Sequence, residues 1–559
     1  MLVEQKSILA GTPVVAGVAY GPALWPGERP AYDPSDHEQV AEADREVELK
    51  RFTDAAAAVA GRLRERASHN SGAAAEVLTA TAALAEDRGW VGAASKLINA
   101  GTPAAGAAVA ATEQFAAMFT KLGGLMAERV TDLNDVRDRV VAELLGAPEP
   151  GVPEPDTPSV LLADDLAPAD TAGLDPQRII ALVTRLGGPT SHTAIIARQL
   201  GIPCVVAVSD LAEIGAGVPV LVDGTAGTIT ERPDETEATE KVAASAREAE
   251  LVNAWRGPGQ TSDGATIGIL ANVADGVSAR AAAEYPVEGV GLFRTELAFL
   301  DRPDAPSIEE QAALYREVID AFAGRKVVIR TLDAGSDKPL KFVTQGNEAN
   351  PALGVRGDRI ALEHPEIRSD QLDAIARAAE GSESAPWVMA PMIASAREAA
   401  AFAEQVRSRG LVAGVMIEIP AAAILAPAIL AEVDFVSIGT NDLTQYTMAA
   451  DRMSAELAGL TDPWQPAVLH LIATVAAAGR ATSKPVGVCG EAAADPLLAC
   501  VLVGLGVTSL SSAPAAAPAV GAKLAQVSVD QCRAAADAAL ATADPAAARE
   551  AATAVLGRR

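Results

Sequence analysis

Short apolar runs alternate with helical stretches from about residue 265 to the C-terminus. About eight such repeats in roughly 300 residues predict a (β/α)8 barrel. An open doubly wound sheet is the alternative, but this part of the chain has no glycine-rich dinucleotide fingerprint. The strand-like runs are ATIGILANV, GVGLFR, KVVIRTLD, LGVR, WVMAPMI, GVMIEIP, FVSIGTND, PVGVCGE and SLSS.

The N-terminal part of the chain carries a different pattern. Residues 8–24 alternate small and apolar residues with glycines, which predicts a pair of strands with tight turns. From Asp36 to about Gly146 apolar residues keep helical spacing, which predicts a helical bundle inserted into a small α/β domain. Residues 158–230 again alternate strands and helices, and the charged stretch 234–255 predicts a linker helix. The predicted parts are an α/β domain (1–35 and 147–233), an inserted helical domain (36–146), a helical linker (234–258) and the barrel (259–559).

Composition narrows the class of protein. Hydrophobic residues make up 49% of the 559 and charged residues 21%, which indicates a globular chain. The net charge of −28 argues against a nucleic-acid binder and favours a soluble protein, with or without a basic partner. Four scattered cysteines without a CxxC pair indicate a reducing compartment and no zinc site. The start MLVEQKSILAG is not a signal peptide, and no apolar stretch reaches the ~20 residues of a membrane span, so we expect a cytoplasmic protein.

The segment GGPTSHTAIIARQLGIP, residues 187–203, contains one of only five histidines. The apolar run RIIALVT before it and CVVAV after it predict two strands, and Gly201 ends the helix between them. Thr190 or Ser191 then caps that helix and His192 lies in its first turn, where unpaired N–H groups favour an anion. Two interpretations fit this pattern: a neutral nucleophile that accepts a phosphoryl group, or a histidine that only forms local hydrogen bonds.

Charged and polar residues stand where the predicted barrel strands end, and those ends meet on one face of a barrel. Arginine forks bind carboxylate and phosphate, and two carboxylates suit Mg²⁺ when a substrate adds its own oxygens. The implied ligand is small, phosphorylated and acidic. A cysteine at one strand end either delivers a proton or is simply a buried apolar residue. These residues are Arg294, Arg330, Arg356, Glu418, Asn441, Asp442 and Cys489.

Several of these segments together resemble a known family. GGPTSHTAIIAR, GVGLFRTE, VVIRTLDAGSDK, EANPALGVR, VMIEIPAA, SIGTNDLTQYTMAADR and GVCGE are similar, in order and over essentially the whole chain, to Enzyme I, the phosphoenolpyruvate–protein phosphotransferases of bacterial sugar uptake. The histidine segment is shared with pyruvate phosphate dikinase and phosphoenolpyruvate synthase. Those relatives need an ATP-grasp domain, and nothing in this sequence supplies one.

The resemblance implies a fold and a role for each candidate residue. The fold is a phosphohistidine swivelling domain with an inserted helical bundle that docks the phosphocarrier HPr, a helical linker, and a TIM-like barrel that binds phosphoenolpyruvate and forms a homodimer. His192 corresponds to the phosphorylated histidine, modified on Nε2, and Cys489 to the proton donor that converts enolpyruvate into pyruvate. Glu418 and Asp442 correspond to the Mg²⁺ ligands. The substrate-binding positions are Arg294, Arg330, Arg452, Asn441, the backbone at Asp442, and the further active-site arginine Arg356.

Two features of the sequence depart from the family pattern. Pro189 stands where the family often has a basic residue, and the stretch after Arg452 differs from the usual one. A barrel that has lost catalysis and serves as a regulatory docking protein is the rival interpretation. The complete set of His192, Glu418, Asp442 and Cys489 argues against that rival.

Overall fold

A computed structural model describes residues 7–27, 29–30, 32, 39–68, 73–122, 125–166, 168–171, 174–188, 191–300, 302–335, 340–343, 348–452 and 454–557. The chain divides into two compact units, residues 1–249 and 250–559. The four domain limits given above remain predictions.

The first unit is built on a mixed sheet, which has eight strands within the described residues. Its order is β1-β8-β7-β3-β4-β5-β6-β2; the central strands β3 to β6 run parallel, and β1, β2, β7 and β8 pair antiparallel with their neighbours. The strands are β1 (Ile8–Ala10), β2 (Thr12–Val15), β3 (Val18–Leu24), β4 (Ser159–Ala163), β5 (Ile179–Thr184), β6 (Cys204–Val206), β7 (Pro219–Asp223) and β8 (Thr228–Glu231).

The strand pair predicted for residues 8–24 is wrong in its pairing. Three strands form there, and none pairs with another: β1 joins β8, β2 joins β6, and β3 lies between β7 and β4. Gly17, with φ +128°, separates β2 from β3 in a backbone conformation that suits glycine. Short strands of this kind find partners by tertiary packing, which local spacing does not encode.

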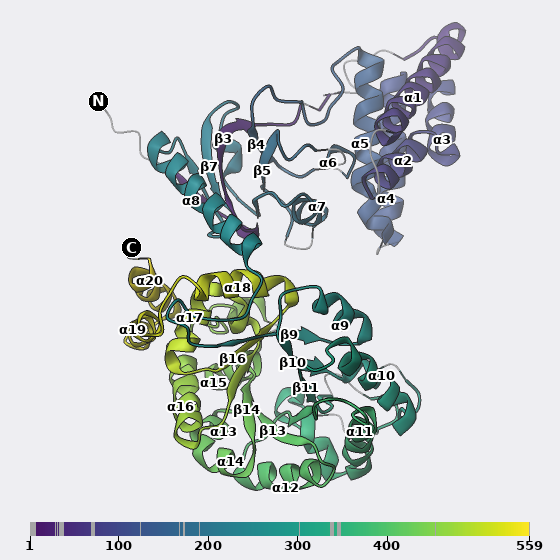
Figure 1. The fold of residues 1–559 in the computed structure, drawn as a ribbon. Helices are drawn as coiled ribbons and strands as arrows, with labels where there is room; N and C mark the ends of the chain where they lie inside the picture. The colour runs from purple at the N-terminus through teal and green to yellow at the C-terminus, as the bar shows by residue number, and fades with distance from the viewer. Residues whose placement is uncertain are drawn as a thin grey trace. The chain divides into compact units, whose positions relative to one another are not determined.

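Five helices form a bundle between β3 and β4 in the sequence (Figure 1), and the prediction of a helical region is confirmed. Their core contains many alanines around a few large side chains; Phe52 and Trp90 lie with ring centroids 5.5 Å apart. The Trp90 indole N–H donates to the Thr112 hydroxyl at 2.9 Å, so both of these buried polar groups have a partner. The helices are α1 (Arg45–Ser68), α2 (Ala73–Ala85), α3 (Arg88–Asn99), α4 (Ala104–Leu122) and α5 (Leu125–Leu145).

The β5–α7–β6 unit (α7, His192–Leu200) has the predicted strand–helix–strand form, with β5 and β6 parallel. Ser191 is the N-cap, and its hydroxyl accepts from the Ala194 N–H at 3.3 Å. Gly201 ends the helix in the left-handed conformation, φ +68°. Two further helices described before the barrel are α6 (Pro168–Thr171) and the predicted linker helix α8 (Glu235–Ala254).

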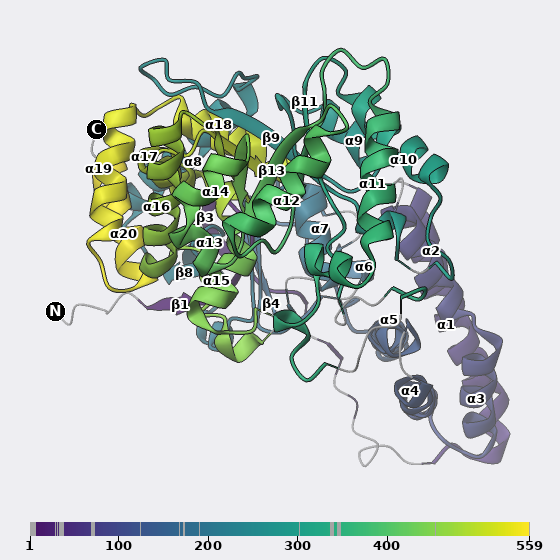
Figure 2. The same ribbon diagram turned by 90° about the horizontal axis from the view of Figure 1, so that it is seen from below.

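The second unit is a closed barrel of parallel strands in the order β9 to β16, with β16 paired to β9. Helices surround the strands, as Figures 1 and 2 show. The predicted fold class, an α/β protein with a C-terminal (β/α)8 barrel, is confirmed. The strands are β9 (Gly268–Val273), β10 (Gly289–Arg294), β11 (Lys326–Arg330), β12 (Trp387–Ala390), β13 (Val412–Ile417), β14 (Phe435–Ile438), β15 (Val486–Cys489) and β16 (Ser509–Ser512).

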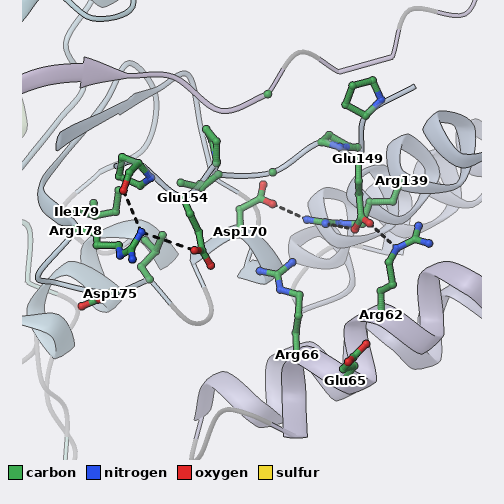
Figure 3. A pocket seen from close by; sticks show the side chains of 18 residues that line it. Arg62, Glu65, Arg66, Arg139, Glu149, Glu154, Asp170, Asp175, Arg178 and Ile179 are labelled. Carbon is green, nitrogen blue, oxygen red and sulfur yellow. Dashed lines mark hydrogen bonds and ion pairs between the residues drawn. The ribbon is translucent and has the colours of Figure 1, made fainter. Parts of the chain in front are cut away.

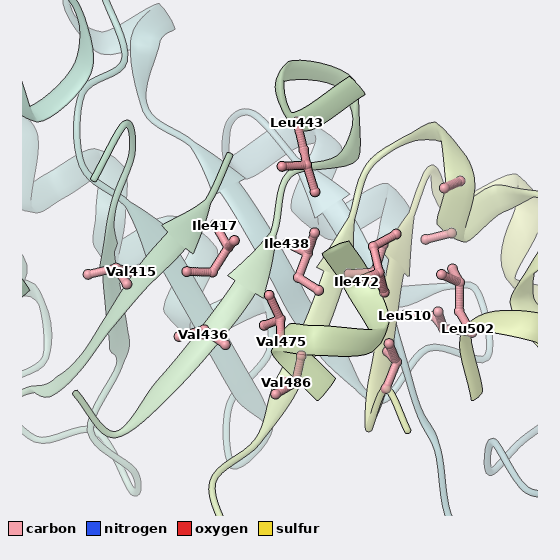
Figure 4. Packing of buried hydrophobic residues seen from close by; sticks show 14 of the residues in the cluster. Val415, Ile417, Val436, Ile438, Leu443, Ile472, Val475, Val486, Leu502 and Leu510 are labelled. Carbon is pink, nitrogen blue, oxygen red and sulfur yellow. The ribbon is translucent and has the colours of Figure 1, made fainter. Parts of the chain in front are cut away.

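Two apolar layers hold the barrel together. Outward-facing strand residues such as Val436, Ile438 and Val486 pack against the helices (Figure 4), and each such buried side chain contributes roughly 1.5–3 kcal/mol. Inward-facing residues such as Met416 and Phe435 fill the barrel itself. The helices are α9 (Gly276–Ala283), α10 (Ile308–Ala321), α11 (Pro365–Ala378), α12 (Ala396–Arg407), α13 (Pro420–Ile424), α14 (Ala426–Glu432), α15 (Thr440–Met448), α16 (Pro466–Thr482), α17 (Pro496–Leu505), α18 (Ala517–Leu524), α19 (Val529–Leu540) and α20 (Pro545–Leu556).

One predicted strand is absent. LGVR, residues 353–356, lies between two 3₁₀ helices, Pro351–Leu353 and Gly357–Leu362, so Arg356 does not end a strand. Pro351 starts the first of these turns, and Gly357 adopts φ +60°, which breaks an extended run. The other eight apolar runs supply the eight strands of the barrel.

In the part of the chain that the structure describes, no helix combines the length and the apolar character needed to cross a bilayer.

Candidate active site

A cavity of about 560 Å³ opens at the carboxyl ends of the barrel strands. Parallel strands bring their final residues to this face, which explains why side chains far apart in the sequence converge there. All the predicted barrel site residues except Arg356 line the cavity. They are Arg294, Arg330, Glu418, Asn441, Asp442, Arg452 and Cys489.

Two buried arginines, Arg330 in the cavity wall and Arg356 outside the lining, are held by carboxylates. Arg330 donates to Glu296 at 2.7 Å and lies 3.3 Å from an Asp333 oxygen. Arg356 donates to Asp333 at 2.9 Å and to Asp442 at 3.2 Å. Burial lowers the pKa of Arg330, but Glu296 and Asp333 raise it more, so the net shift is upward. Both guanidinium groups therefore carry a permanent positive charge and are held in place by carboxylates. Arg356 influences the cavity through its hydrogen bond to Asp442, which lines it.

Glu296 and Asp333 were not among the residues predicted from the sequence. Glu296 follows Arg294 by two positions and Asp333 follows Arg330 by three, in the segments GVGLFRTE and VVIRTLD. A carboxylate so close to a strand-end arginine is the signal that could have revealed them.

Arg294 and Arg452 differ from the buried pair. Both side chains are exposed, and neither guanidinium forms a hydrogen bond or ion pair with another described residue. Their donors are available to a ligand in the cavity, and an arginine fork suits a carboxylate or phosphate group.

Glu418 is the most deeply buried carboxylate of the site, with 1% of its surface exposed. It accepts the Met392 N–H at 3.0 Å, and Met392 adopts φ +59°, an uncommon conformation for a side chain of this size. Burial raises the pKa of Glu418, Asp442 and Asp333 raise it further, and Arg330 opposes them, which brings it to about 8. This excess of buried negative charge is the condition that a divalent cation relieves.

The donor set around Glu418 fits Mg²⁺. Glu418 and Asp442 offer hard carboxylate oxygens, and Mg²⁺ usually binds one or two carboxylates with water and substrate oxygens completing its shell. No cluster of three or more His, Cys, Asp or Glu side chains suited to a metal occurs among the described residues.

Glycines allow the loops of the site to approach closely. A Cβ atom at Gly439 would lie 2.7 Å from Glu418 Oε1, and one at Gly490 would lie 2.2 Å from the Thr440 hydroxyl. Helix α15 starts at Thr440, so Asn441 and Asp442 lie in its first turn, next to unpaired backbone N–H groups. The side-chain oxygen of Asn441 accepts the Glu491 N–H at 3.2 Å, which leaves the side-chain NH₂ group of Asn441 to donate to another partner.

Cys489 ends β15 with 4% of its surface exposed. The Ser437 hydroxyl donates to its sulfur at 3.0 Å. Burial raises the pKa of the thiol; Ser437, Arg330 and Arg294 lower it, and the result is about 11. Burial therefore outweighs the neighbouring cations, and the thiol carries a proton at neutral pH.

The other predicted catalytic residue, His192, is the first residue of α7 in the first unit. Its imidazole, and all of Pro189 and Thr190, lie outside what the structure describes. The next residue, Thr193, is 1% exposed, and its hydroxyl has no hydrogen-bond partner among the described residues. A helix start with such a hydroxyl suits an anion at this end of α7.

A second cavity, of about 940 Å³, lies between the helical bundle and the α/β part of the first unit (Figure 3) and contains none of the predicted site residues. Arg139, 1% exposed, donates to three carboxylates: Asp135 at 2.8 Å, Glu149 at 2.7 Å and Asp170 at 2.6 Å. Arg62 donates to the other Glu149 oxygen at 2.6 Å. These ion pairs join helix α5 to helix α6 and to Glu149, which gives this part of the cavity wall a structural role.

Comparison with known proteins identifies three family models along the chain. They are described as PEP-utilising enzyme N-terminal (residues 10–129), mobile domain (155–227) and PEP-binding domain (248–529).

The chain is also similar to individual proteins over much of its length. It is 49% identical over 555 residues to the phosphoenolpyruvate-protein phosphotransferase of Streptomyces coelicolor, covering 99% of this chain and 100% of that protein. A protein of the same name from Haloferax volcanii is 38% identical over 502 residues, 86% of this chain and 88% of that one. The multiphosphoryl transfer protein of Rhodobacter capsulatus is 44% identical over 407 residues, which is 70% of this chain and 49% of the longer protein.

Proposed function

Because the chain belongs to the phosphoenolpyruvate–protein phosphotransferase family of PEP-utilising enzymes, we propose that it takes the phosphoryl group of phosphoenolpyruvate onto its own His192 and passes it to a histidine of the phosphocarrier HPr. The observation that carries this proposal is the barrel cavity, where arginines without a partner among the described residues, the carboxylates of Glu418 and Asp442 and a protonated thiol line one space.

Phosphoenolpyruvate binds through its carboxylate and phosphate groups. Arg294 and Arg452 supply free forks from the exposed side of the cavity, and Arg330 supplies a fixed positive charge from its wall. The Asn441 amide adds a neutral donor. Because the buried carboxylates hold Arg330 and Arg356 in place, the site needs little rearrangement when the substrate arrives.

Mg²⁺ is the cofactor, held by Glu418 and Asp442. When bound it neutralises charge on the substrate oxygens and polarises them. The chain's contribution is to hold the two carboxylates in a buried site: Met392 N–H orients Glu418 and Arg356 orients Asp442.

Cys489 protonates the methylene carbon of the enolate that remains when the phosphoryl group leaves. The high pKa of its thiol keeps the proton available at neutral pH, as a general acid requires. His192 is the phosphoryl acceptor, and the start of α7 with the Thr193 hydroxyl stabilises the added negative charge. The reaction thus uses residues of both units.

Partners and location follow from the same proposal. The helical domain, residues 36–146, docks HPr, and the barrel, residues 259–559, mediates a homodimer. The α/β domain (1–35 and 147–233) carries His192, and residues 234–258 link it to the barrel. The protein acts in the cytoplasm, where phosphoenolpyruvate and HPr are found.

Labelled phosphoenolpyruvate tests the whole reaction. With Mg²⁺ the purified protein should acquire the label and release one pyruvate for each phosphoryl group, and added HPr should then take up the label. Release of pyruvate without transfer to HPr would contradict the role of HPr. No reaction in any combination would favour the regulatory docking protein, and a reaction that required ATP would favour the dikinase or synthase relatives.

A further inference from the structure

One hydroxyl inside the barrel has no role in the reaction described so far. Ser437 lies on β14 with 6% of its surface exposed, and its side chain faces the barrel interior because Val436 and Ile438 face the helices. The only hydrogen-bond partner of the hydroxyl among the described residues is the Cys489 sulfur, at 3.0 Å.

The sheet register produces this contact. Ser437 is the Cα partner of Gly487, and Cys489 is the next inward-facing residue along β15. Gly487 has no side chain, so β15 places no Cβ atom opposite Ser437 in the barrel interior. The Ser437 hydroxyl can therefore reach the Cys489 sulfur on the same strand.

We propose that Ser437 is a positioning residue for proton transfer from Cys489: its hydroxyl donates to the sulfur, so that the thiol hydrogen is free to face the cavity and the thiolate is stabilised once the proton has left. This inference rests on the proposed role of Cys489 as proton donor.

The chemistry of the step determines the direction of the hydrogen bond. The S–H bond breaks, the proton and the electron pair of the enolate form the third C–H bond of the pyruvate methyl group, and a thiolate remains. A thiolate has no hydrogen and can only accept, so the Ser437 hydroxyl is the donor in that state. Water later returns a proton to the sulfur. Hydrogen bonds to charged groups are stronger than those to neutral groups, so the Ser437 hydroxyl stabilises the developing thiolate more than the neutral thiol. This difference lowers the barrier to proton transfer.

Other charged groups also act on the sulfur. Arg330 and Arg294 favour the thiolate and Glu418 opposes it. None of these makes a hydrogen bond to the sulfur in the structure, so their influence should persist when the Ser437 hydroxyl is removed. The effect of Ser437 is therefore separable from theirs.

The test compares full-length variants in two measurements: Mg²⁺-dependent exchange of deuterium into the pyruvate methyl group, and the rate at which iodoacetamide alkylates Cys489 at pH 8, which reports the thiolate fraction. Ser437→Ala should slow both by roughly 10–100-fold, the equivalent of one hydrogen bond to a charged group. Its affinity for phosphoenolpyruvate, measured by calorimetry, should stay within about twofold, since no substrate contact is lost.

Two further variants separate positioning from packing. Ser437→Thr keeps the hydroxyl and should restore most of both rates. Ser511→Ala is the matched control: Ser511 is equally buried inside the barrel, next to Cys489 in the sheet, but its hydroxyl bonds to Ala271 and Asn272 instead. It should leave both rates near the wild-type values.

The outcomes distinguish this inference from the role of Cys489 itself. If Cys489→Ala exchanged deuterium at the wild-type rate, the proton donor would be another group and the proposed function would lose that step. If Cys489→Ala were inactive while Ser437→Ala matched the wild type, only the role of Ser437 would be overturned. Equal slowing by Ser437→Ala and Ser511→Ala would also overturn it, because the cause would then be packing.

Discussion

Among the described residues, the buried arginine networks around Arg139 and around Arg330 differ in whether arginines without a protein partner stand beside them. Around Arg139 in the first unit, each of the three guanidinium nitrogens donates to a different carboxylate. At the barrel mouth Arg330 is also held by carboxylates, but the exposed forks of Arg294 and Arg452 have no partner among the described residues. Ion pairs in which every guanidinium nitrogen has a carboxylate partner hold helices together. A site with arginine donors available beside a buried carboxylate can bind an anion together with a cation.

Cavity size alone would have selected the wrong region. The cavity beside Arg139 measures about 940 Å³ and the barrel cavity about 560 Å³. The smaller one contains Glu418, which is 1% exposed and whose pKa is raised to about 8, and two arginine forks that have no partner among the described residues. The following variants are designed to break or sharpen this contrast.

The largest effect is expected for Glu418→Gln. The amide keeps an oxygen to accept the Met392 N–H but cannot serve as an anionic metal ligand, so phosphorylation by phosphoenolpyruvate should fall by roughly a thousandfold or more. The free energy of unfolding should change by less than about 1 kcal/mol, because a carboxyl with a pKa of about 8 is largely protonated at neutral pH and the amide keeps its shape. Stopped-flow phosphorylation and urea unfolding measure the two quantities. A variant that kept wild-type Mg²⁺ dependence would show that the cation binds elsewhere.

Arg139→Ala should lower the stability of the first unit and leave the barrel site intact. It removes the cation that bonds to both Asp135 and Asp170, which should destabilise the first unit by about 3–5 kcal/mol. Binding of phosphoenolpyruvate to the barrel should not change. Amide hydrogen exchange along α5 reports the loss of stability. Arg62→Ala is the control, since its ion pairs are partly exposed and should cost at most about 1 kcal/mol.

Arg294→Ala should produce a smaller and purely functional loss. Affinity for phosphoenolpyruvate should fall about 10–100-fold, the value of a charge-assisted contact, while stability is unchanged because the guanidinium has no partner to lose among the described residues. Calorimetry with Mg²⁺ measures the affinity. Arg533→Ala removes a similar charge from an exposed side chain on helix α19, which does not line the cavity, and this variant should bind as the wild type does. Equal weakening in both variants would mean that only long-range charge matters.

The sequence predicted the barrel and most of its mouth because strand ends are local features. Arg294, Arg330, Glu418 and Cys489 each end or directly follow an apolar run, and the parallel arrangement of the strands brings them together. Arg356 shows the limit of that argument. It reaches the site from a turn, held by Asp333 and Asp442, and no spacing rule indicates such a contact.

Contacts inside the barrel could not be predicted from the sequence either, because they depend on how the strands are aligned. The bond between Ser437 and Cys489 joins two strands 52 residues apart and depends on the register of β14 with β15. The direction of the Cys489 pKa shift also required the structure. Burial raises this pKa and the nearby cations lower it, and the net shift depends on how deeply the thiol is buried and how far away the cations lie. Likewise, the strands within residues 8–24 find partners more than a hundred residues away.

The central claim is that the barrel cavity delivers a phosphoryl group to His192, and mapping of the label tests it most directly. Wild-type protein and His192→Ala are incubated with labelled phosphoenolpyruvate and Mg²⁺, and the modified peptide is identified by mass spectrometry. The account predicts an acid-labile, base-stable label on residues 187–203 of the wild type, and none on His192→Ala, which still binds phosphoenolpyruvate. A label retained by His192→Ala, or mapped to another residue of the wild type, would contradict it.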